Sequence, residues 1–84
     1  MFEQGRYAEA AGRFTDPLRR GAALYRAGDF EAAAAAFARV DSAEAALNRG
    51  NALVLLGRYE DAILAFQRAL QLRPDWSAAQ TNLA

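Results

Sequence analysis

The fold follows most directly from residues 43–76, which read AEAALNRGNALVLLGRYEDAILAFQRALQLRPDW. Apolar and small residues recur there at the three- and four-residue spacing of an α-helix, once before Gly57 and again after it. Glycine ends a helix at little steric cost, and proline cannot continue one. The segment therefore predicts two helices, from about Ala43 to Leu56 and from Tyr59 to Leu72, joined at Gly57 and stopped by Pro74.

The same pattern occurs earlier in the chain. A shift of 29 residues aligns residues 20–40 with residues 49–69 and makes ten of the 21 positions identical. Self-similarity at such a period is typical of proteins built from stacked helix pairs. We therefore predict a single array with a leading half repeat over 1–14, a shortened repeat over 15–42, a full 34-residue repeat over 43–76 and the start of a further helix over 77–84.

The two junctions in the N-terminal half are abrupt. Asp16 precedes Pro17, and this order predicts an N-cap followed by proline in the first helical turn. Asp41 with Glu44 three residues later resembles a capping box for the next helix. We expect the helices before residue 42 to be shorter than those after it, and their connections to be tighter.

The composition excludes several classes of function. The chain has no histidine, cysteine or lysine, which argues against the usual zinc sites, cysteine nucleophiles and histidine acid–base catalysis. Ten arginines balance ten acidic residues, so the charge of a nucleic-acid-binding protein is absent. The longest apolar run, Ala32–Ala38, is far shorter than the ~18 residues of a membrane span. We expect no enzyme activity, cofactor, metal, nucleic-acid partner or direct membrane insertion.

The best-formed unit resembles the tetratricopeptide repeat. The resemblance implies an all-α fold of antiparallel helix-turn-helix repeats stacked as a right-handed solenoid, and a function in protein–protein interaction. Ala46 departs from the pattern, because tryptophan is usual at that place. The residues that carry the resemblance are Gly50, Leu53, Gly57, Tyr59, Ala62, Phe66, Ala69 and Pro74.

A narrower resemblance concerns the order of the units. The leading Gly-Arg-Tyr helix, the segment from Phe14 to Phe30 and the stretch Asn48–Leu53 are together similar to the tetratricopeptide segment that follows a von Willebrand factor A domain in bacterial membrane-anchored Bat-type proteins. This resemblance implies that the 84 residues are a soluble part of a longer protein attached to the inner membrane, which works with an AAA+ ATPase. The resemblance is compatible with either the periplasmic or the cytoplasmic side of that membrane.

The resemblance also indicates where a partner would bind. The first helix of each repeat lines the concave face, so side chains of those helices are the candidates for contact with a protein or peptide. Asn48 and Asn51 fall where family members that clamp a peptide carboxylate carry asparagine, but the lysines of such a clamp are absent. A structural role for both asparagines is the alternative. The partner-binding candidates are Arg19, Tyr25, Arg26, Asn48, Asn51 and Leu55, with Leu18, Ala22, Leu47, Val54 and Asn82 on or beside the same face.

Self-association is the second candidate function. We expect Ile63, Phe66 and Leu70 to form the inner stripe of the last complete helix, with the residues after Ser77 covering part of it. Because a further helix at 77–84 has no partner helix within the sequence, an apolar face is predicted to be open to a second copy of the chain. Trp76 is expected to pack between successive units instead of serving as an exposed anchor.

Overall fold

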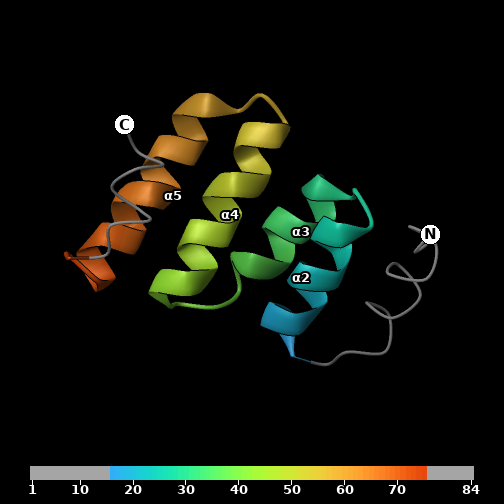
Figure 1. Ribbon diagram of the computed structural model, residues 1–84, viewed down its shortest axis with the longest axis horizontal. Coiled ribbons are helices and arrows are strands. Elements are labelled where there is room, and N and C mark those ends of the chain that lie inside the picture. The colour runs from blue at the N-terminus through green and yellow to red at the C-terminus, as the bar shows by residue number, and fades with distance from the viewer. Residues whose placement is uncertain (1–15, 76–84) are drawn as a thin grey trace.

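The computed structural model describes residues 16–75, which form α-helices and no strands (Figure 1). This part of the chain confirms the predicted all-α class. The predicted leading half repeat at 1–14, Trp76 and the predicted helix start at 77–84 lie outside the described residues. The helices are α2 (Pro17–Arg26), α3 (Phe30–Phe37), α4 (Ala43–Leu55) and α5 (Tyr59–Leu72).

The helices pack in chain order as two pairs. Helix α2 packs on α3, and α4 packs on α5, which runs beside it in the opposite direction (Figure 1). Contacts between α3 and α4 join the two pairs. Helices α2 and α3 have 10 and 8 residues, against 13 and 14 in α4 and α5, so the prediction of shorter helices in the N-terminal half is confirmed.

The turn inside each pair closes in the same way. Gly28 and Gly57 have φ angles of 85° and 77°, which lie in the left-handed region that side chains other than glycine avoid. In the second turn the Arg58 N–H donates to the Leu53 carbonyl at 2.9 Å, and the first turn has the equivalent bond at 3.0 Å. These bonds satisfy helix-end carbonyls in the manner of a Schellman motif. The two glycines are therefore required by backbone geometry.

The N-terminal caps confirm one prediction and correct another. Asp16 caps α2 as expected, because its carboxylate accepts a hydrogen bond from the Leu18 N–H at 3.0 Å. The predicted capping box of Asp41 with Glu44 is wrong. Ser42 is the cap of α4, and its hydroxyl accepts from the Ala45 N–H at 3.1 Å. Since α4 begins at Ala43, the serine is at the capping position and Asp41 is one residue too early.

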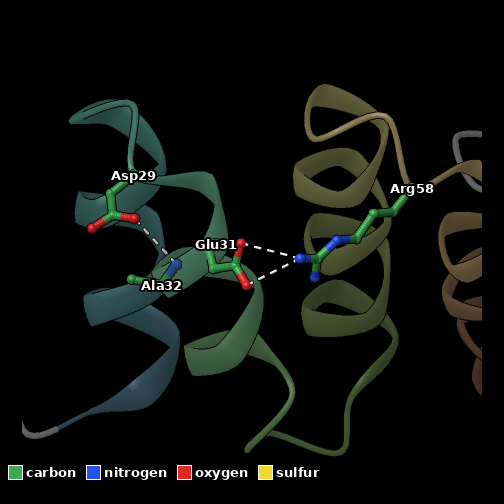
Figure 2. Close-up of polar contacts among 4 residues, drawn as sticks. All are labelled: Asp29, Glu31, Ala32 and Arg58. Atoms are coloured by element: carbon green, nitrogen blue, oxygen red, sulfur yellow. Dashed lines mark hydrogen bonds and ion pairs between the residues drawn. The ribbon is translucent and has the colours of Figure 1, made fainter.

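Two ion pairs link the helix pairs at the surface. Arg58 lies 3.1 Å from Glu31 at the start of α3 (Figure 2). Arg68 of α5 lies 2.8 Å from Asp41. All four side chains are about half exposed or more, so each pair contributes roughly 0–1 kcal/mol. Figure 2 also shows Asp29 accepting from the Ala32 N–H at 3.2 Å, which caps α3. These contacts position the pairs more than they stabilise them.

A glycine and a phenylalanine meet in the core of each helix pair. Phe37 and Phe66 are each only 2% exposed. A Cβ atom placed on Gly21 would lie 2.6 Å from the Phe37 ring, and one on Gly50 would lie 2.3 Å from the Phe66 ring. The absence of a side chain at each glycine lets the ring rest against the neighbouring helix backbone. Small buried residues fill the surrounding space, among them Ala33, Ala45, Ala52, Ala62 and Ala69.

Helix α5 exposes several large apolar side chains. Ile63 was expected on the inner stripe with Phe66, but Ile63 is 43% exposed. Tyr59 and Leu64 are 63% and 64% exposed. Helical spacing identifies residues that share a face, but α5 is the last described helix, and within residues 16–75 no helix packs over this side. Among the same residues, no helix combines the length and apolar character needed to cross a membrane.

Candidate functional site

A groove runs between the first helices of the two pairs. It encloses about 430 Å³ and is lined by side chains of α2 and α4, together with the buried ring of Phe37 from α3. We call this hollow the α2/α4 groove. The residues that line it are Ala22, Tyr25, Arg26, Phe37, Glu44, Asn48 and Asn51.

The groove contains most of the side chains that the repeat pattern predicts. Four of the six partner-binding candidates, Tyr25, Arg26, Asn48 and Asn51, line it together. The other two, Arg19 and Leu55, are exposed and lie outside it. The Arg19 guanidinium instead lies 3.9 Å from the carboxylate of Asp16, the N-cap of the same helix.

The remaining predicted neighbours divide in the same way. Ala22 lines the groove, whereas Leu18 and Val54 do not. Leu47 is 9% exposed and belongs to the core cluster, so its placement on the binding face is wrong. Helix α4 packs between α3 and α5, and Leu47 belongs to the core cluster that residues of these two helices form. Asn82 lies outside the described residues.

Glu44 is the principal groove residue that the sequence analysis missed. It precedes Asn48 by four residues and Asn51 by seven, so the three side chains share one face of α4. That spacing was a usable signal. The capping-box interpretation obscured it, because an acidic residue in a first helical turn is explained by the helix dipole alone. Phe37 was also missed, since its position in the second helix of a pair assigns it to the core.

Packing fixes the tyrosine of the groove. Tyr25 is half-buried, and its ring meets the Phe30 ring edge to face, with centroids 5.2 Å apart and an interplanar angle of 70°. Such aromatic pairs contribute roughly 0.5–1.5 kcal/mol beyond the area they bury. Tyr25 also packs against the core cluster. The aromatic wall of the groove is therefore held in place before any ligand arrives.

Two further hollows occupy the same place in each helix pair. One encloses about 270 Å³ against α2 and α3, and the other encloses about 390 Å³ against α4 and α5. Under the 29-residue shift, five of the seven residues that line the first hollow correspond to residues that line the second, and each hollow has two arginines. A hollow that recurs with the repeat is a result of the packing of each pair. The corresponding residues are Pro17 with Ala46, Arg20 with Arg49, Ala35 with Leu64, Ala36 with Ala65 and Arg39 with Arg68.

The side chains of the α2/α4 groove are suited to non-covalent recognition. Asparagine amides both donate and accept hydrogen bonds, and arginine donates to carboxylates and carbonyls. Tyr25 adds a phenol that has the same two capacities on a rigid ring. Within residues 16–75, no three acidic side chains gather in a way that could hold a metal ion. The chemistry on the groove walls is that of a surface for peptide groups.

Comparison with known proteins identifies one segment of the chain. Residues 43–75 match the family model of the tetratricopeptide repeat. The matched segment contains α4 and α5 in full, and so includes Glu44, Asn48 and Asn51. No curated protein matches the chain.

Proposed function

We propose that this chain, which contains a tetratricopeptide repeat at residues 43–75, is an interaction module that binds a protein or peptide segment in the α2/α4 groove. Tetratricopeptide repeats mediate protein–protein interaction, and stacked helical repeats use extended grooves for it. The observation that carries the proposal is the convergence of Tyr25 and Arg26 from one pair with Asn48 and Asn51 from the next. Binding is then the function, without chemistry on the ligand.

The groove fits an extended peptide better than a folded surface. Its volume of about 430 Å³ accommodates a few residues and not a domain. Peptide bonds present one donor and one acceptor per residue, and the amides of Asn48 and Asn51 can pair with both. The half-buried Tyr25 offers apolar contact to the ligand side chains between those bonds.

Replacing Arg26 and Asn51 together by alanine tests this proposal. Loss of one charged and one neutral hydrogen-bonding group should weaken a bound peptide by about 10- to 100-fold in Kd. The probe is a peptide selected from a displayed random library on the 84-residue chain, and its Kd is measured by isothermal titration calorimetry. Both side chains lie at least partly at the surface, so the circular dichroism spectrum should not change.

The control for this experiment is Arg49→Ala. Arg49 is an exposed arginine of α4 that lies outside the groove, so its loss should leave the Kd within about twofold. Unchanged affinity in the Arg26→Ala, Asn51→Ala variant would remove both residues from the binding site.

Self-association is the second function that an observation favours. Tyr59 and Ile63, one turn apart, expose apolar surface on one side of α5, and a second copy of the chain would remove that surface from water. We infer a homodimer through this face as the alternative to peptide binding. The two functions use different surfaces. Peptide binding would change the environment of the groove residues, whereas dimerisation would change that of the exposed α5 residues as the protein concentration rises.

The narrower family remains part of the proposal. The order of the repeats supports placing this chain in a longer, bacterial membrane-anchored protein that has a von Willebrand factor A domain. The flanking coding sequence tests this placement. A membrane span and such a domain upstream would support it, and a different domain context would contradict it.

A further inference from the structure

The α2/α4 groove contains two opposite charges that do not neutralise each other. Arg26 lies on the α2 side and Glu44 on the α4 side. Neither side chain forms an ion pair within residues 16–75, whereas Arg19, Arg58 and Arg68 are each paired with a carboxylate. The walls of the groove therefore offer both a cationic and an anionic group to a ligand.

The two charges lie at opposite ends of the groove. Helices α2 and α4 run in the same direction in Figure 1, and Arg26 is the last residue of α2 whereas Glu44 is the second residue of α4. Under the 29-residue shift Arg26 corresponds to Leu55, which is the last residue of α4. At a rise of 1.5 Å per residue, Glu44 and Leu55 are separated by roughly 15 Å along the axis of α4. An extended peptide covers this length in about five residues. Arg26 and Glu44 can therefore meet different side chains of one extended ligand.

We propose that the groove selects a peptide segment with one acidic and one basic side chain, roughly three to five residues apart. The acidic side chain pairs with Arg26 and the basic one with Glu44, while Asn48 and Asn51 hold the main chain between them. This inference rests on the proposed function of the groove, and it adds the charge pattern of the ligand.

Charge complementarity explains why other ligands would bind less well. A carboxylate opposite Arg26 gains charge-assisted hydrogen bonds, and guanidinium groups favour this partner. A purely acidic ligand would place like charge beside Glu44, and a purely basic one would place it beside Arg26, which disfavours both. A C-terminal carboxylate alone leaves Glu44 without a counter-charge.

Selection of peptides on the intact chain tests the pattern first. The probe is a displayed library of random linear dodecapeptides flanked on both sides, so that no free terminus is presented. We expect the enriched peptides to share one acidic and one basic residue at the stated spacing. Enriched peptides with acidic residues alone would overturn the inference while leaving the groove as a binding site.

Exchange of the two charges in the protein is the sharper test. Arg26→Glu and Glu44→Arg should each weaken a selected peptide by at least about tenfold. The double variant should regain affinity for a peptide in which the acidic and basic residues are exchanged, and not for the original. Equal binding of both peptides to the double variant would overturn the inference.

Helix-end effects need a matched control, because Glu44 also lies in the first turn of α4, where an acid is favourable. Glu60 lies in the first turn of α5 and outside the groove, so Glu60→Arg reproduces the helix-end change alone. It should leave peptide affinity within about twofold. If no selected peptide responds to Arg26→Ala with Asn51→Ala, the proposed function itself fails, which is a different outcome from failure of the charge pattern.

Discussion

Phe66→Ala will destabilise the chain by about 3–5 kcal/mol, enough to leave much of it unfolded at room temperature. Phe66 is 2% exposed and belongs to the core cluster with Leu47, Leu53 and a set of alanines. Alanines cannot extend into the space that a lost ring leaves, so the cavity would persist. A small array with a thin core has little stability to lose.

Urea unfolding followed by far-ultraviolet circular dichroism measures this loss. The matched control is Leu64→Ala on the same helix, because Leu64 is 64% exposed. The control should stay within about 0.5 kcal/mol of the unsubstituted chain. A Phe66→Ala variant with the same unfolding midpoint as the control would contradict the account of the core.

Gly50→Ala will destabilise the chain by roughly 1–3 kcal/mol, although alanine is the better helix former by about 1 kcal/mol. The added Cβ would lie 2.3 Å from Cε1 of Phe66, closer than atoms can approach, and the buried ring has no free space to move into. The sign of the effect is therefore set by the clash and not by helix propensity.

A double-mutant cycle with Phe66→Leu isolates that clash. Leucine removes the ring edge that faces Gly50, so the double variant should be more stable than the sum of the two single losses predicts, by about 1 kcal/mol or more. Urea midpoints of the four proteins give the coupling energy. Strictly additive losses would show that Gly50 and Phe66 act independently, contrary to their contact.

The helix boundaries were predictable because their causes are local. Helix α5 begins and ends where the sequence predicts, and α4 ends one residue earlier, at Leu55. Gly57 has a φ of 77°, and a glycine at the end of a helical pattern predicts such a left-handed conformation. The cap of α4 was mispredicted because Asp41 and Ser42 are both good capping residues, and only the position of the first helical residue decides between them.

The candidate site was predictable only in part, for a tertiary reason. Repeat position predicted that Tyr25, Arg26, Asn48 and Asn51 share one face, and the four side chains line the α2/α4 groove together. It could not show that Leu47 turns into the core, because that depends on how α4 packs between its neighbours. Glu44 was not predicted to line the groove, because the helix dipole alone explains an acidic residue in the first turn of α4. Its contribution to the groove becomes visible only when α2 and α4 are placed side by side.

Nuclear magnetic resonance titration of a selected peptide into the ¹⁵N-labelled 84-residue chain locates the surface that the peptide binds. Peptide binding in the α2/α4 groove predicts that the largest shift changes occur at the groove residues, including the side-chain amides of Asn48 and Asn51, with little change along the outward side of α5. Changes confined to Tyr59 and Ile63, appearing as the protein is concentrated and leaving the groove signals unmoved by peptide, would contradict it.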